Sequence, residues 1–189
     1  MNLINMDAFS PVEVPPKIKH GAAAEKIAFS IGESALGVVL VARSADGVCA
    51  ILIGSEAAEL ESDLARRFTD SKLVRNDRKL SNDLQKILRF IEAPSEGLNL
   101  PLDIRGTPFQ QRVWDELLRI PPGSIVTYGA LANRIGEPGA VRAVANACAA
   151  NAIALAIPCH RVVRSNGALS GYRRGVERKR ALLAKEALT

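Results

Sequence analysis

Short hydrophobic segments separated by turn residues characterise the early part of the chain. Residues 26–34, 36–45 and 47–54 read KIAFSIGES, LGVVLVARSA and GVCAILIG, and many of their apolar side chains are β-branched. The connections between these segments contain glycine, serine and aspartate, which favour tight turns. This pattern predicts three consecutive antiparallel strands.

The spacing of the apolar residues then changes to that of helices. Residues 55–68 have large apolar side chains four positions apart, and Ser55 precedes them as an N-cap. A second helix is predicted over residues 81–93, with Ser81 as its N-cap and Pro94 as the residue that ends it. Strands followed by helices indicate a small α+β domain, and no catalytic group of residues is evident within it.

Another helix is predicted to begin at Thr107, which is a favourable N-cap. Pro108 suits the first helical position, and apolar residues follow at helical spacing. The preceding segment, EGLNLPLDIRGTP, is typical of a junction between domains. We therefore expect a flexible tail over residues 1–22, an α+β domain over residues 23–98 and a mainly helical domain over residues 99–189.

Two short helices joined by a tight GEPG turn are predicted within residues 127–151, TYGALANRIGEPGAVRAVANACAAN. This arrangement is typical of a helix-turn-helix, although many helical hairpins share it. The second helix is mostly alanine and offers few long polar side chains to read base edges in the major groove. Its small residues could permit close approach to a narrow groove, or they could pack in a core, and the pattern leaves both open.

The composition excludes several classes of protein. The chain has 189 residues, of which 48% are hydrophobic and 24% charged, as in ordinary soluble globular proteins. No apolar run approaches the length of a membrane helix, and the N-terminus lacks the features of a secretory signal. The three cysteines have no metal-ligand spacing. We expect a cytoplasmic protein without membrane contact, disulfide framework or metal site.

Positive charge is concentrated in the second half of the chain. Residues 1–100 contain 12 basic and 14 acidic residues, whereas residues 101–189 contain 13 basic and 6 acidic residues. A basic half with many arginines indicates a polyanionic partner, most often a nucleic acid. A solvated basic surface would have the same composition, so the charge alone leaves both interpretations open.

A cysteine and a histidine are adjacent in AIPCHRVV, residues 156–163. A thiolate is a strong nucleophile, and a nearby histidine is a common means of forming it. Neighbouring side chains of an extended segment point to opposite faces, so Cys159 and His160 would need a turn or a bridging water. A carboxylate of the last helix, Glu177 or Glu186, could orient the imidazole. A chance Cys-His pair is the alternative.

Longer motifs around this pair resemble those of a known family. The segment IPCHRVV and the following SNGALSGYRRGVERKRALLAKE are similar to the active-site motif of the O6-alkylguanine-DNA alkyltransferases, or methylated-DNA–protein-cysteine methyltransferases. The upstream segment RGTPFQQRVWDELLRIPPGSIVTYGALANRIGEPGAVRAVANACAAN resembles the same family. The resemblance covers residues 100–189 and extends more loosely back to residue 26.

The resemblance implies a fold and a reaction. The fold is α+β, with a small RNase H-like N-terminal domain and a mainly helical C-terminal domain that carries a helix-turn-helix. The reaction is direct-reversal repair of double-stranded DNA, in which an alkyl group moves from O6-alkylguanine to a cysteine of the protein; action on O4-alkylthymine stays open. A base must leave the duplex to reach such a thiol. A thioether product does not regenerate the thiol, so each protein molecule acts once. We expect the protein to be a monomer that needs no cofactor.

The resemblance also implies roles for individual residues. Cys159 would accept the alkyl group, His160 would deprotonate it through a water, and Glu186 would orient His160. Asn151 would brace the turn between the helix-turn-helix and the active-site segment. DNA-binding residues would be Tyr128, Arg142, Ala143 and Asn146, and residues bordering the base pocket would be Tyr172, Val162 and Cys148. Phosphate contacts would come from arginines of the basic segment, although some of these could instead only solvate the last helix: Arg161, Arg164, Arg173, Arg174, Arg178 and Arg180.

The sequence departs from the family pattern at one position, and three other functions are considered as alternatives. Arg174 occupies a position where many relatives have a small residue, which puts the acceptance of bulky alkyl groups in question. A lesion-binding protein without activity would have lost the cysteine, but PCHR is intact here. A transcription factor would read the major groove, and a thiol hydrolase would need an oxyanion hole and repeated turnover.

Overall fold

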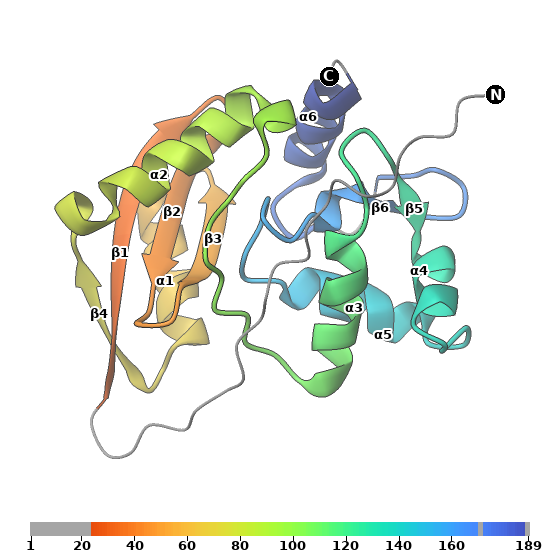
Figure 1. Cartoon of the computed structure of the whole chain (residues 1–189), viewed down its shortest axis with the longest axis horizontal. Helices are drawn as coiled ribbons and strands as arrows, with labels where there is room; N and C mark the ends of the chain where they lie inside the picture. The colour runs from red at the N-terminus through yellow and green to blue at the C-terminus, as the bar shows by residue number, and fades with distance from the viewer. Residues whose placement is uncertain (1–23, 170–171, 188–189) are drawn as a thin grey trace.

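A computed structural model of the chain describes residues 24–169 and 172–187. The flexible tail predicted over residues 1–22 lies outside the described residues. The structure contains both helices and a sheet, which confirms the predicted α+β class. Figure 1 shows the sheet and its helices on one side and a group of mostly short helices on the other.

The three predicted strands form an antiparallel meander of β1 (Glu25–Ser34), β2 (Gly37–Arg43) and β3 (Val48–Gly54). A fourth strand, β4 (Ser71–Arg75), pairs in parallel with β1, so the strand order is β3-β2-β1-β4. The sequence pattern did not predict β4. It is a short edge strand in which no side chain is fully buried, and it therefore lacks the apolar alternation of a core strand.

Helix α1 (Ala57–Arg67) follows β3, but Ser55 is not its N-cap. The N-cap is Glu56, whose side chain makes no capping hydrogen bond. The hydroxyl of Ser55 instead accepts a hydrogen bond from Arg178 at 3.0 Å. The predicted cap is therefore wrong, because this serine contacts the second half of the chain.

Helix α2 (Asp77–Glu92) begins four residues before the predicted Ser81 cap. The side chain of Asn76 accepts a hydrogen bond from the Lys79 amide at 3.0 Å, so Asn76 is the N-cap and the prediction for Ser81 is wrong. The helix ends before Pro94, as the sequence predicted. Pro94 begins the short 3-10 helix η1 (Pro94–Glu96), which the sequence did not predict.

Helices α1 and α2 cover opposite faces of the sheet (Figure 1). Val39 and Val41 of β2 belong to the same core cluster as the buried residues of α2. The alternate residue Leu40 packs with Leu60 and Leu64 of α1, because successive side chains of a strand point to opposite faces. The cluster on the α2 face continues into the second half of the chain.

Helix α3 (Pro108–Leu118) starts as predicted. Thr107 and Gln110 form a capping box, in which each side chain accepts a hydrogen bond from the backbone amide of the other residue. Six elements follow α3 in the described part of the chain: β5 (Val126–Thr127), α4 (Tyr128–Arg134), α5 (Val141–Ala150), the 3-10 helix η2 (Cys159–Arg161), β6 (Val162–Val163) and α6 (Val176–Ala187). Strands β5 and β6 pair in parallel.

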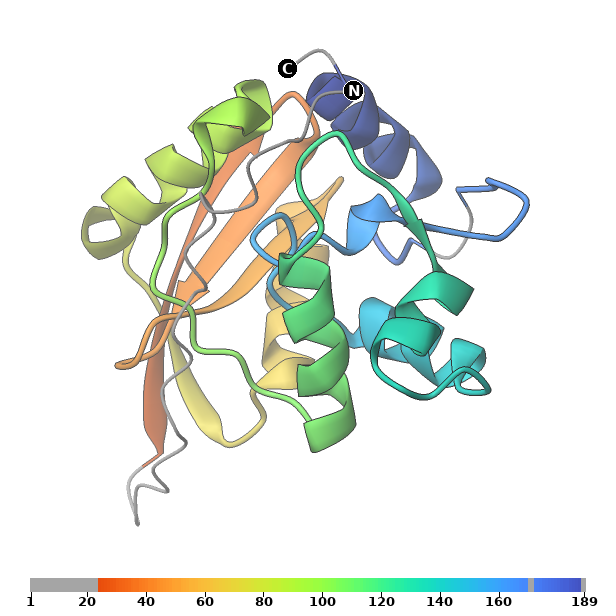
Figure 2. The ribbon, with the colours of Figure 1, turned by 45° about the vertical axis from the view of Figure 1, so that its right-hand side comes forward.

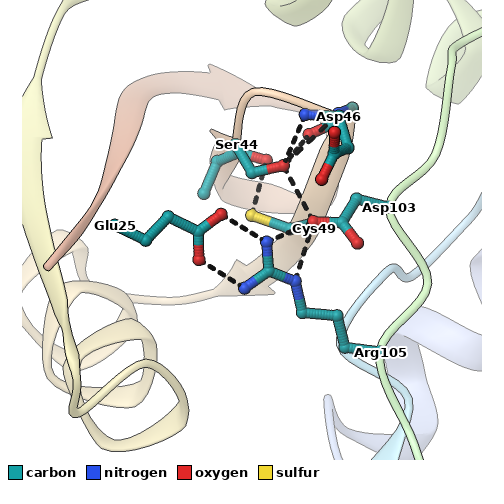
Figure 3. Close-up of polar contacts among 8 residues, drawn as sticks. Glu25, Ser44, Asp46, Cys49, Asp103 and Arg105 are labelled. Carbon is teal, nitrogen blue, oxygen red and sulfur yellow. Dashed lines mark hydrogen bonds and ion pairs between the residues drawn. The ribbon is translucent and has the colours of Figure 1, made fainter. Parts of the chain in front are cut away.

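Backbone and side-chain contacts join the two halves of the chain. Isolated bridges connect Val48 with Leu102 and Ile51 with Ile153. Figure 3 shows a second connection, in which Arg105 lies between the carboxylates of Glu25 and Asp103. Ser44, in the turn after β2, donates a hydrogen bond to Asp103 at 2.8 Å.

Within the described part of the chain, no helix combines the length and the apolar character needed to cross a membrane.

Candidate active site

Cys159 is a buried residue at the start of η2, only 7% exposed to solvent. Figure 2 shows η2 between α6 above and helices α3 and α5 below. The thiol sulfur accepts a hydrogen bond from the side-chain amide of Asn151, with 3.3 Å between Nδ2 and Sγ. Cys159 is therefore held in place by the residue at the end of α5.

Asn151 joins the end of α5 to the segment that carries the cysteine. Its Nδ2 also donates to the carbonyl of Ile157 at 2.9 Å, and its Oδ1 accepts from the amide of Ile153 at 2.8 Å. The intervening turn includes Leu155 with a φ of 70°, a conformation that is unusual for residues other than glycine. The buried amide of Asn151 thus satisfies the polar backbone groups of a tight turn.

His160 follows Cys159 and points to the last helix. Its Nε2 lies 2.8 Å from Oε1 of Glu186, and both side chains are buried. The other candidate carboxylate, Glu177, is exposed and pairs with Arg180. Of the two alternatives left open by the sequence, the structure places Glu186 beside the imidazole.

Arg161 also binds Glu186, and the sequence did not predict this contact. Its Nε and Nη2 lie 3.0 and 2.8 Å from carboxylate oxygens of Glu186. Burial disfavours the carboxylate, but the hydrogen bonds from His160 and Arg161 outweigh this effect and lower the pKa of Glu186 to about 2. Glu186 is therefore ionised at neutral pH.

The ionised carboxylate determines which nitrogen of His160 carries the proton. An anionic acceptor requires a donor, so Nε2 is protonated, and Nδ1 has a free lone pair when the ring is neutral. Burial lowers the pKa of His160, which keeps the ring neutral at pH 7. Nδ1 is buried and makes no hydrogen bond to the described residues. His160 is thus a neutral base with an available acceptor nitrogen.

The thiol of Cys159 is protonated in this environment. Burial raises its pKa, and this effect is opposed by the hydrogen bond from Asn151 and by the positive charges of Arg174 and Lys179. Formation of the nucleophilic thiolate therefore requires a base.

Lys179 is a further residue of the site that the sequence analysis missed. It is fully buried, donates a hydrogen bond to the carbonyl of Val162, and lies 5.9 Å from the centre of the Tyr172 ring. Lys179, Leu182 and Glu186 are the buried residues of α6. Their helical spacing was the available signal, because a lysine on the buried face of a helix is rare.

A small cavity of about 10 Å³ adjoins the thiol. That volume has room for about one water molecule. Besides Cys159 itself, four predicted site residues line it: Tyr128, Cys148, Asn151 and Tyr172. Ala149, Arg173 and Arg174 also line it. Val162, also predicted to border the base pocket, is not among these residues. A bound group larger than a water molecule would require this cavity to open.

Helix α5 has one exposed and one buried face. Arg142, Ala143 and Asn146 are exposed, whereas Ala147 and Cys148 are buried. The small residues of the buried face pack in the core, and groove binding by the exposed face stays a prediction. Arg142 makes no hydrogen bond or ion pair with the described residues, so its side chain is available to a partner.

The predicted phosphate contacts are wrong for two of the six arginines. Arg161 is buried against Glu186 and donates to the carbonyl of Ile120. Arg174 is 8% exposed and donates to the carbonyl of Asn151 at 3.3 Å. Neither guanidinium is accessible to a DNA backbone. Of the other four, Arg178 is half-buried, and the exposed side chains are Arg164, Arg173 and Arg180.

Comparison with known proteins identifies a family and similar sequences. The model for the DNA-binding domain of 6-O-methylguanine DNA methyltransferases matches residues 108–188. The bifunctional transcriptional activator/DNA repair enzyme Ada of Escherichia coli is 47% identical over 171 residues, which cover 90% of this chain and 48% of that protein. The inducible methylated-DNA–protein-cysteine methyltransferase of Bacillus subtilis is 40% identical over 139 residues, covering 72% of this chain and 78% of that protein.

The fold is similar to solved structures with related sequences. The crystal structure of Mycobacterium tuberculosis OGT in complex with DNA has a TM-score of 0.67 and 32% sequence identity, and covers 86% of this chain and 93% of that chain. The chain spans about half the length of the Ada protein that it matches.

Proposed function

The chain belongs to the methylated-DNA–protein-cysteine methyltransferase family, and from this premise we propose that it repairs DNA by moving an alkyl group from O6 of guanine to Cys159. The observation that carries the proposal is the arrangement of Cys159, Asn151, His160 and Glu186. The arrangement supplies a protected thiol, a neutral base with a free nitrogen and an anion that stabilises the base when it becomes protonated.

The reaction begins with loss of the thiol proton. His160 accepts it at Nδ1 through a water, and Glu186 stabilises the imidazolium that forms. The thiolate of Cys159 attacks the alkyl carbon, so that a C–S bond forms while the bond from this carbon to O6 breaks. The electron pair remains on guanine, which takes up a proton. The thioether is stable, and each molecule acts once.

We further propose that helices α4 and α5 are a helix-turn-helix that binds the minor groove of double-stranded DNA. Ala143 and Asn146 would face the groove, because small side chains permit close approach. Arg142 would replace the extruded guanine in the base stack, and Tyr128 would press on the adjacent phosphate. The solved complex of the similar M. tuberculosis protein with DNA supports this partner.

The extruded base would occupy an enlarged form of the cavity beside Cys159, bordered by Tyr172, Cys148 and the backbone of Val162. In this proposal, residues 99–189 of a monomer carry DNA binding and chemistry, and residues 23–98 are an RNase H-like domain that supports them. Whether O4-alkylthymine is accepted depends on the same cavity.

The proposal is tested with a duplex that contains a single O6-methylguanine. Purified protein is mixed with excess duplex, and the restored guanine is measured in hydrolysed DNA against time. We expect the amount of guanine to reach a plateau at one equivalent per protein molecule, and Cys159→Ser to restore none while still binding the duplex. Continued turnover, or repair by Cys159→Ser, would show that the proposed reaction is wrong.

A further inference from the structure

Arg174 is an unusual residue to find beside a nucleophile. Its side chain is buried, and it lines the same cavity as Cys159. Within residues 24–169 and 172–187, no carboxylate lies within ion-pairing distance of its guanidinium, whose hydrogen bond goes to the backbone carbonyl of Asn151. A buried cation without a counter-ion is costly, so this position favours an anion.

The neighbouring Arg173 differs from Arg174 in this respect. Its guanidinium is half-exposed and pairs with Asp63 at 3.0 Å. Asp63 also binds Arg66 and Arg67, so the charge of this carboxylate is already shared among three arginines. Arg173 therefore offers a control of equal charge at an adjacent position.

Arg173 and Arg174 also separate the thiol cavity from a wider cleft. The cleft has a volume of about 740 Å³ and lies between α1 and the segment before α6. Arg66 and Arg178 line it with them, and its acidic residues are Glu59 and Asp63. Four arginines and two carboxylates thus line the cleft that adjoins Arg174.

We propose that Arg174 selects O6-alkyl groups that carry a carboxylate, of which O6-carboxymethylguanine is the simplest, an inference that rests on the function proposed above. The carboxylate would form the ion pair that Arg174 lacks. A neutral group of the same size would leave the buried guanidinium unpaired, and charge-assisted hydrogen bonds are stronger than neutral ones. The arginine thus determines specificity by charge in addition to occupying space.

The carboxymethyl group would be transferred by the same steps as a methyl group. The thiolate of Cys159 attacks the methylene carbon, a C–S bond forms and the bond from the methylene carbon to O6 breaks. Guanine keeps the electron pair and takes up a proton, and the protein carries S-carboxymethylcysteine. The new carboxylate would remain beside Arg174 after the reaction.

The test compares three duplexes that are identical except for the O6 substituent: methyl, carboxymethyl and the neutral, nearly isosteric carbamoylmethyl. Single-turnover rates are measured for the wild type, Arg174→Gln, Arg174→Lys and Arg173→Gln. We expect the wild type to react about tenfold faster with carboxymethyl than with carbamoylmethyl, as one strong charged hydrogen bond allows. The ratio should fall to about one in Arg174→Gln, be partly kept in Arg174→Lys and be unchanged in Arg173→Gln.

The wild-type ratio tests the inference even if a variant fails to fold. A ratio of one or less in the wild type, or an equal loss in Arg173→Gln and Arg174→Gln, would overturn the role of Arg174. In either case, transfer from the methyl duplex would show that the proposed function itself holds. Absence of transfer from all three duplexes would instead overturn the proposed function, and the inference with it.

Discussion

At the scale of single residues, Glu186 binds both His160 and Arg161, and the sequence alone suggested only the first of these contacts. It accepts hydrogen bonds from His160 and from Arg161, and all three side chains are buried. The family resemblance suggested the contact with His160. The contact with Arg161 depends on the packing of α6 against η2, and no local sequence pattern predicts it.

Replacing Glu186 by glutamine tests both roles. Arg161 would keep its positive charge without an anion, and loss of one partner of a buried pair costs about 3–5 kcal/mol of unfolding free energy. Alkyl transfer by the folded variant should slow by roughly tenfold or more, because the base is no longer oriented and stabilised. Urea denaturation and single-turnover kinetics measure the two effects.

The matched control is Glu177→Gln in the first turn of the same helix, where the carboxylate is exposed. The Glu177→Gln variant should have nearly the same unfolding free energy and the same rate of alkyl transfer as the wild type. Transfer by Glu186→Gln at the wild-type rate would rule out the orienting role.

The buried state of His160 predicts a pH dependence of stability. Burial lowers its folded-state pKa below 6.5, so the stabilisation is present above pH 6.5 and is lost as the pH falls below it. The pKa of Glu186 is likewise lowered, from 4.5 to about 2, and its contribution is lost at still lower pH. We expect the unfolding free energy to decrease between pH 6.5 and 5 in the wild type but much less in His160→Gln. Parallel curves for the two proteins would contradict this assignment.

At the scale of elements, α5 has one face packed in the core and one face exposed to solvent. Its buried face includes Val144 and Ala147, and its exposed face includes Arg142 and Asn146. The alanine-rich sequence could not distinguish core packing from groove binding, because both favour small side chains. Which residues of α5 are buried depends on its tertiary contacts with α3 and α4, and the local sequence does not contain this information.

Arg142→Ala tests the function of the exposed face. If Arg142 fills the gap left by the guanine, its loss should slow transfer from duplex DNA by roughly 10- to 100-fold, since extrusion costs a few kcal/mol. Reaction with free O6-methylguanine base should change little, because no extrusion is needed. Rates with both substrates are measured on the same preparation, with Arg78→Ala on the exposed surface of α2 as the control. Equal losses on both substrates would mean that Arg142 supports the fold or the pocket.

The beginnings of helices show which elements the sequence could predict. The start of α3 was predicted correctly because Thr107 and Pro108 act locally. The start of α2 was not, because Asn76 and Ser81 are both good N-caps. The burial of Leu80 between them favours the longer helix, and that burial depends on distant residues of the sheet.

At the scale of the whole molecule, the two halves of the chain share one hydrophobic cluster. Val39 of the sheet, Ile87 of α2, Trp114 of α3 and Cys159 of η2 all belong to it. The sequence predicted a boundary near residue 98 from the Pro- and Gly-containing junction. It could not predict the shared packing or the burial of Lys179, since both result from contacts between segments far apart in the chain.

The Arg105 cluster is expected to stabilise the connection between the halves. Arg105→Met keeps the aliphatic stem but leaves Glu25 and Asp103 without their cation. We expect a loss of about 1–2 kcal/mol of unfolding free energy, allowing for the partial exposure of these groups. Arg75→Met, which removes an exposed ion pair with Asp77, is the control and should change stability much less, because exposed ion pairs contribute little. Equal effects in urea denaturation would show that the cluster adds nothing to the connection.

The central claim is that Cys159 alone receives the alkyl group, and peptide mass spectrometry tests it most directly. The protein is incubated with duplex DNA containing O6-methylguanine, digested, and the peptides with each cysteine are measured. We predict one methyl group per molecule, on Cys159. Burial raises the pKa of all three thiols, and only Cys159 is followed in the sequence by a histidine that can act as its base. Methyl groups on Cys49 or Cys148, or an unmodified Cys159 after guanine has been restored, would contradict the account.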